Sequence, residues 1–171
     1  LLLVAIGLGE EFGELIEKRN KYSFFLFDSK YDIFLDKKKK KKKNELIEGI
    51  KKEIGDVYWY LIMNFYYLDY RFEEKIENII YKETNISNTY EGDLGSLLTW
   101  YLMYLGTIKK RYRDNLENQE SCVGILIKLE EIIRIFCKNL KINQKEVLEL
   151  NIKKLADRKK RGKIQGNGDN R

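Results

Sequence analysis

Proline and histidine are both absent from this chain of 171 residues, and cysteine occurs only twice. The lack of proline and of turn-forming clusters favours a chain that is mostly helix, because proline interrupts helices. Without histidine, catalysis by a Ser-His or Cys-His pair is excluded. Cys122 and Cys137 lie in apolar segments and form no C-x-x-C motif, which argues against zinc and dithiol chemistry. We interpret them as buried hydrophobes and expect a cytoplasmic protein.

Long apolar runs are also missing. The longest candidate, LLLVAIGL at residues 1–8, is too short to cross a bilayer and leads directly into acidic residues. We therefore expect no membrane partner.

Charge is present in quantity, but it is segregated along the chain. The formal charge of +6 includes +7 from the lysines of residues 37–43 and +6 from residues 151–171, so −7 remains on the rest. A nucleic-acid groove needs basic residues spread over one face, so nucleic acid is not an expected partner. An acidic body with a basic tail suits a site that holds a cation together with an anionic ligand.

Hydrophobic periodicity predicts an all-α helical bundle in one domain, residues 1–171. Helices are expected at residues 1–20, 45–69, 72–83, 97–113 and 121–140, and a last one from Asn143 or Gln144 to near Gly162. Residues 84–95 are predicted to be a linker, and GKIQGNGDNR to be a glycine-rich tail, either flexible or closing over a substrate.

The segment of residues 22–44, which includes the lysine run, is predicted to be a loop with solvated charges. A patch that touches nucleic acid or acidic lipid is the functional alternative for the run.

A degenerate internal repeat is indicated at an offset of 72 residues. It divides the domain into an acid-bearing first half, residues 1–83, and a second half, residues 96–161, followed by the tail, residues 162–171. Under this alignment Ile125 and Lys128 take the places of Glu53 and Asp56, so the second half has lost the acids.

Two pairs of acidic residues carry the chemistry. Glu11 and Glu14 are spaced i, i+3 on one predicted helix, and Glu53 and Asp56 are spaced in the same way on another. Residues three apart share a helix face, so two packed helices would bring four carboxylates to one cavity. Oxygen ligands suit Mg²⁺, with Mn²⁺ as the alternative. An ordinary solvated helix face is the competing interpretation of each pair.

Beside these acids, the small residues Gly13 and Gly55 are expected to allow close approach of the helices. Glu10, Glu14 and Glu17 are candidates for the group that activates water. Tyr60 shares the acidic stripe of its helix, whereas Trp59 points elsewhere and is interpreted as a core residue.

The motifs GLGEEFGEL and EIGDVYWYL, together with the C-terminal stretch EVLELNIKKLADRKKRGKIQGNGDNR, resemble those of the MazG-like all-α nucleoside triphosphate pyrophosphohydrolases. The resemblance covers roughly residues 3–69 and 140–171. It implies a bundle that binds Mg²⁺ and cleaves a nucleoside triphosphate to the monophosphate and pyrophosphate. It also implies that Glu11, Glu14, Glu53 and Asp56 are the metal ligands and catalytic residues. By the same resemblance Tyr60 lines the nucleotide pocket, and Asn151, Lys154 and Arg158 contact the substrate.

The middle of the chain departs from the family pattern, because Asp56 and Asn151 are separated by 95 residues. An internal repeat would explain the extra segment by replacing a partner subunit, so both a homo-oligomer and a monomer with an internal pseudo-dimer stay open. Two alternatives for function also stay open. One is a dUTPase-like or dCTPase-like hydrolase of deoxypyrimidine nucleotides, and the other is a non-enzymatic helical module with a basic loop.

Overall fold

The computed structural model describes residues 1–29, 37–68, 94–115 and 118–162. These residues form five α-helices and contain no β-strand, which confirms the all-α prediction. The helices are α1 (Leu2–Ser29), α2 (Lys37–Tyr67), α4 (Leu94–Asp114), α5 (Gln119–Asn139) and α6 (Gln144–Lys160). The predicted helix at residues 72–83, most of the predicted linker and residues 163–171 lie outside the described part of the chain.

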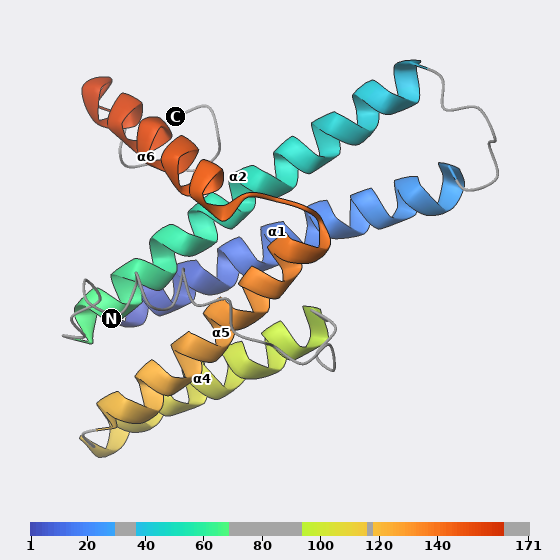
Figure 1. Ribbon diagram of the computed structural model, residues 1–171. Coiled ribbons are helices and arrows are strands. Elements are labelled where there is room, and N and C mark those ends of the chain that lie inside the picture. The colour runs from blue at the N-terminus through green and yellow to red at the C-terminus, as the bar shows by residue number, and fades with distance from the viewer. Residues whose placement is uncertain (30–36, 69–93, 116–117, 163–171) are drawn as a thin grey trace.

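Two antiparallel hairpins make up the bundle (Figure 1). Helices α1 and α2 form the longer hairpin, and they make the most extensive packing in the described structure. Helices α4 and α5 form the second hairpin, with α4 against α1 and α5 against α2, while α6 packs on α2. This arrangement places α2 at the centre of the packing.

The apolar stripes that the sequence predicts do form the core. On α1 the stripe residues are at most 2% exposed: Ala5, Leu8, Phe12 and Leu15. On α2 the core residues of the stripe are equally buried: Ile50, Ile54, Val57, Leu61 and Phe65. Both cysteines are free and buried, as expected. Since helical periodicity places such residues on one face, the two stripes meet when the helices pack.

The prediction of a loop at residues 22–44 is wrong for most of this segment. Helix α1 continues to Ser29, and the lysine run forms the first two turns of α2. No glycine or proline interrupts residues 14–48, and lysine has a good intrinsic helix propensity. Propensity and packing therefore outweigh the mutual repulsion of the lysines.

The turn between α5 and α6 directs the last helix back over α2. Lys141 adopts a left-handed conformation with φ 57°, and the Ile142 N–H bonds to the Cys137 carbonyl at 2.8 Å. This is the hydrogen bond of a Schellman motif. Asn143 then caps α6, because its side chain accepts hydrogen bonds from the N–H groups of Lys145 and Glu146. The predicted start of α6 is confirmed, and Gly162, with φ 66°, follows its end.

The internal repeat stays a prediction. The Tyr58 hydroxyl of α2 lies 3.4 Å from Glu130 Oε1 of α5, and these two residues are 72 positions apart. Residues that are equivalent under a repeat are expected to contact each other next to a pseudo-two-fold axis. Superposition of the α1–α2 hairpin on the α4–α5 hairpin would test this.

Candidate metal-binding site on α1 and α2

Two facing stripes on α1 and α2 bring the acidic residues together. The α1 stripe is Gly7, Glu11, Glu14 and Lys18, and the α2 stripe, in the order that faces it, is Tyr60, Asp56, Glu53 and Gly49. A glycine at each end lies opposite a large side chain. A Cβ atom added to Gly7 would lie 2.2 Å from Cε1 of Tyr60, and one added to Gly49 would lie 3.7 Å from Cδ of Lys18. The fit between Gly7 and Tyr60 thus favours the register that sets the acids opposite each other.

Three of the four predicted ligands form a cluster. One carboxylate oxygen from each of Glu11, Glu14 and Glu53 lies within 4.8 Å of the other two. Glu53 is 3% exposed, while Glu11 is half-buried and Glu14 is exposed. The cluster is therefore open to solvent on the side of Glu14, from which a cation and a ligand could enter.

Asp56, the fourth predicted ligand, is held by α6. Its Oδ1 accepts a hydrogen bond of 2.8 Å from Nδ2 of Asn151, and its Oδ2 forms an ion pair with the ammonium group of Lys154. The neighbouring Gly55 allows this approach, because a Cβ there would lie 3.0 Å from Cβ of Asn151. Gly55 thus allows the approach of α6, not that of α1, and the close approach expected at Gly13 is wrong, since nothing lies within 4 Å of a Cβ added there.

The other three acids act electrostatically on Glu11. Partial burial, followed by the negative charges of Asp56, Glu14 and Glu53, raises the pKa of Glu11 to about 7, although Lys154 opposes the shift. The charge of Asp56 is thus near enough to the cluster to raise the pKa of Glu11. Like charges this close destabilise the ionised cluster until a cation balances them.

Lys18 supplies one positive charge to this side of the site. Its Nζ lies 3.7 Å from Oε1 of Glu53, and it stands one turn beyond Glu14 on α1. The sequence places Lys18 on the acidic stripe, but the i, i+4 spacing alone does not identify its partner on the other helix.

The remaining predicted residues lie at the margins. Tyr60 packs against Gly7, one turn from Asp56, and Arg158 on α6 is 7% exposed. Glu10 is exposed, and Glu17 forms a surface ion pair with Lys21. Trp59 is 42% exposed, so its interpretation as a core residue is wrong. Of the three residues predicted as candidates for activating water, Glu14 is therefore the one that belongs to the acidic cluster.

Helix α4 contributes contacts that the sequence gives no means of finding. The Tyr101 hydroxyl donates to the Ala5 carbonyl at 2.9 Å, and its ring stands edge-on to Phe12 with centroids 5.5 Å apart. The Tyr104 hydroxyl donates to Asn64 Oδ1 at 2.7 Å. Asn64 in turn donates to the Val4 carbonyl at 3.0 Å. The second hairpin thus holds the start of α1 in place before the acidic stripe begins.

The donor set fits a hard divalent cation. The ligands in reach are carboxylate oxygens, which Mg²⁺ and Mn²⁺ prefer, and the described residues include no cysteine beside them. Comparison of this chain with protein-family models, with curated proteins and with solved structures finds no match.

Proposed function

We propose that this chain is a Mg²⁺-dependent nucleoside triphosphate pyrophosphohydrolase, with Mn²⁺ as an alternative metal. The observation that supports the proposal is the cluster of Glu11, Glu14 and Glu53, whose oxygens lie within 4.8 Å of one another. Asp56 lies next to this cluster and connects it to Lys154. Acids and a lysine in one site suit a ligand made of a cation and a polyphosphate.

The roles of the residues follow from their positions. Glu11, Glu14, Glu53 and Asp56 would hold the metal, which when bound neutralises phosphate charge and polarises the P–O bond. Glu14 is the most exposed of the acids in the cluster, and it is the one we assign to orient water and accept its proton. The water oxygen bonds to phosphorus, the bond between the α- and β-phosphates breaks, and pyrophosphate leaves.

The basic and polar groups of α6 complete the assignment. Lys154 and Asn151 already contact Asp56, so both stand at the edge of the acidic site. We assign Lys154 to the phosphates of the substrate, where a positive charge stabilises the developing negative charge. Arg158 and Tyr60 are assigned to the substrate by resemblance, to the phosphates and to the nucleoside respectively.

The experiment that tests this function is a panel of standard NTPs and dNTPs with Mg²⁺, in which pyrophosphate is measured separately from orthophosphate. Pyrophosphate release that disappears with EDTA and in Glu53→Gln supports the proposal. Binding of Mn²⁺, followed by calorimetry in the wild type and in Glu53→Gln, gives a readout that is independent of turnover. A protein that neither binds Mn²⁺ nor releases pyrophosphate would exclude this function.

The same panel decides the substrate. A preference for dUTP or dCTP would support the deoxypyrimidine alternative, whereas activity on many triphosphates would support a broader role in clearing nucleotides. Measurement of molar mass in solution would separate the homo-oligomer from the monomer with an internal pseudo-dimer.

A further inference from the structure

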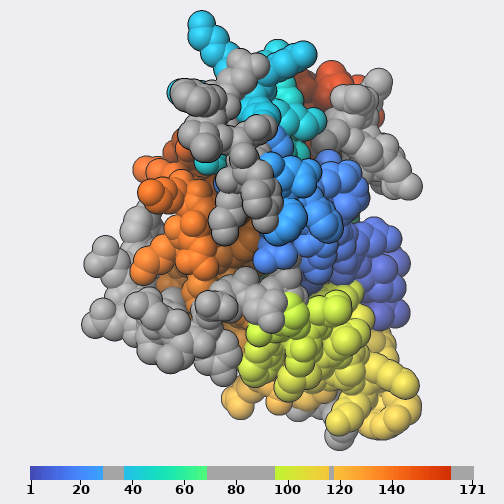
Figure 2. Space-filling view, turned by 90° about the vertical axis from the view of Figure 1, so that its right-hand side faces the viewer, coloured from blue at the N-terminus to red at the C-terminus, as the bar shows by residue number. Residues whose placement is uncertain are grey.

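The end of the α1–α2 hairpin extends past the other helices and carries a surface that the proposed function does not use (Figure 1). This surface, here called the basic arm, consists of residues 22–28 of α1 and residues 37–45 of α2. In Figure 2 the first turns of α2 stand at the end of the molecule opposite α4. The start of α2 thus lies far from α4 in this view.

The basic arm is strongly positive. Residues 37–43 are seven lysines, and no acidic residue follows in α2 until Glu45. Five of them are exposed: Lys37, Lys38, Lys40, Lys41 and Lys42. Consecutive helical residues are about 100° apart, so the charges surround the helix and do not line one groove. A convex positive surface fits an extended negative one.

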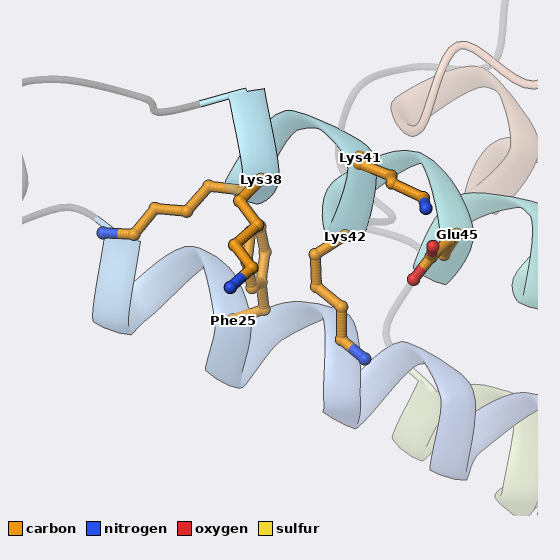
Figure 3. Close-up of a pocket in the computed structure, with 6 residues that line it drawn as sticks. Phe25, Lys38, Lys41, Lys42 and Glu45 are labelled. Atoms are coloured by element: carbon orange, nitrogen blue, oxygen red, sulfur yellow. The ribbon is translucent and has the colours of Figure 1, made fainter.

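Apolar side chains are exposed on the α1 side of the same arm. Phe24, Leu26 and Phe27 are 71%, 40% and 63% exposed. Phe25 lies in a pocket of about 360 Å³ next to α2, which Lys38, Lys39, Lys41, Lys42 and Glu45 also line. Figure 3 shows lysine side chains of α2 reaching toward α1 around this ring. Exposed phenylalanine and leucine thus accompany the lysines.

We propose that the basic arm binds the surface of an anionic lipid bilayer. This departs from the expectation of no membrane partner, which rested only on the lack of a segment that could span a bilayer. Clusters of four to eight basic residues on a helix are attracted to anionic headgroups, each contributing roughly a fivefold gain in affinity near the surface. Phe24, Leu26 and Phe27 supply the second, apolar contribution that durable surface binding needs. None of the described helices is long and apolar enough to cross a bilayer, so the interaction is confined to its surface.

A bilayer accounts for the arm better than nucleic acid does. Base stacking would use the phenylalanines but gives no role to Leu26, and a run of lysine without arginine lacks the planar groups that read base edges. The acidic body of the protein would be repelled by the same bilayer, so the arm would approach it first. This inference is independent of the proposed hydrolase activity.

The test is co-sedimentation of the chain of 171 residues with phosphatidylcholine vesicles prepared with and without phosphatidylserine. The chain is expected to bind only the vesicles that contain phosphatidylserine, and this binding is expected to weaken as salt rises. The triple substitution Lys38→Gln, Lys41→Gln and Lys42→Gln should weaken it by roughly 100-fold, at about fivefold per lysine. The double substitution Phe24→Ser and Phe27→Ser should weaken binding even at low salt, because it removes the apolar contribution.

The matched control removes three exposed lysines elsewhere, Lys109→Gln, Lys110→Gln and Lys138→Gln, and should leave vesicle binding within a few-fold. Circular dichroism verifies that each variant is folded. Absence of binding to phosphatidylserine vesicles, equal binding to neutral vesicles, or an equal loss in the control would overturn the proposal. The proposal would also be overturned if the chain bound a single-stranded oligonucleotide more tightly than phosphatidylserine vesicles at the same salt, with oligonucleotide binding measured by fluorescence anisotropy.

Discussion

Glu53 on α2 and Glu130 on α5 are both 3% exposed, yet they lie in very different surroundings. Glu53 faces two further carboxylates, those of Glu11 and Glu14. Glu130 faces the Tyr58 hydroxyl at 3.4 Å and Nε of Arg134 at 3.6 Å. Burial raises the pKa of Glu130 to about 7, and Arg134 offsets the shift only in part.

The difference teaches what makes a buried acid a candidate ligand. A single buried carboxylate beside an arginine and a tyrosine can be accommodated by hydrogen bonds or by binding a proton. Several carboxylates within a few ångströms of one another repel, and a divalent cation relieves that repulsion. We therefore expect substitutions at the acidic cluster to affect activity, and substitution of Glu130 to affect stability.

The largest effect is expected from Asp56→Asn. The change keeps the size of the side chain but removes one negative charge from the proposed metal site and from the ion pair with Lys154. Loss of a metal ligand should lower kcat/KM by roughly 10²-fold or more, which corresponds to about 1.4 kcal/mol per tenfold. Pyrophosphate release under saturating Mg²⁺ is the measurement.

The control for this substitution is Lys128→Asn, at the aligned position of the second half. Lys128 makes an exposed ion pair with Glu131 and should be dispensable for turnover. Full Mg²⁺-dependent activity in Asp56→Asn would show that the acids of α1 and α2 are an ordinary charged surface.

The second prediction breaks the register that creates the acidic cluster. In Gly7→Val the new Cβ would lie 2.2 Å from the Tyr60 ring, so the helices must separate or the ring must move. Overpacking of this kind costs typically 1–3 kcal/mol, and it should also lower Mn²⁺ affinity by separating the carboxylates. Urea denaturation and calorimetry measure the two effects. Gly13→Ala, where nothing lies within 4 Å of the added Cβ, is the control.

The third prediction concerns pH and Glu130, which lies outside the acidic cluster. Its pKa is about 7 in the folded chain, against the ordinary glutamate value of 4.5, so between these two pH values the folded state binds a proton that the unfolded state does not. Stability should therefore fall as pH rises through this window, by at most about 3 to 4 kcal/mol. The groups that act on Glu130 are the Tyr58 hydroxyl of α2 and, on α5, Arg134, Glu131 and Cys137. Gln144 donates a hydrogen bond to the same Tyr58 hydroxyl.

Glu130→Gln removes this titration, so the difference in urea midpoint between pH 5 and pH 8 should shrink. The acidic cluster contributes a change of the same sign, because the pKa of Glu11 is also raised. The comparison is therefore made between variant and wild type in the same metal-free buffer. If the difference in urea midpoint between pH 5 and pH 8 were the same in Glu130→Gln and in the wild type, Glu130 would already be ionised in the folded chain. Turnover of Glu130→Gln at pH 7 should stay close to that of the wild type.

The smallest effect is expected at the basic arm. Lys38→Gln, Lys41→Gln and Lys42→Gln remove three exposed charges from the first turns of α2, away from the acidic cluster. Turnover in solution should stay within a few-fold of the wild type. A loss of several orders of magnitude would show that the lysines take part in catalysis.

The helical class, the buried stripes and the two acidic pairs can all be predicted from the sequence. These properties depend on spacing along one helix, and residues three or four apart share a face whatever packs against them. The pairing of Glu11 and Glu14 with Glu53 also follows from the sequence once two amphipathic helices are assumed to be antiparallel. The start of α6 at Asn143 follows from local capping chemistry.

Tertiary structure alone decided which distant groups complete the site. The contacts of Asn151 and Lys154 with Asp56 span 95 and 98 residues, and those of Tyr101 and Tyr104 depend on how the second hairpin packs. Periodicity carries no information about such partners, because it reports which face is buried and not what covers it. The lysine run shows the same limit, since its repulsion predicts a loop whereas helix propensity and packing against α1 keep it helical.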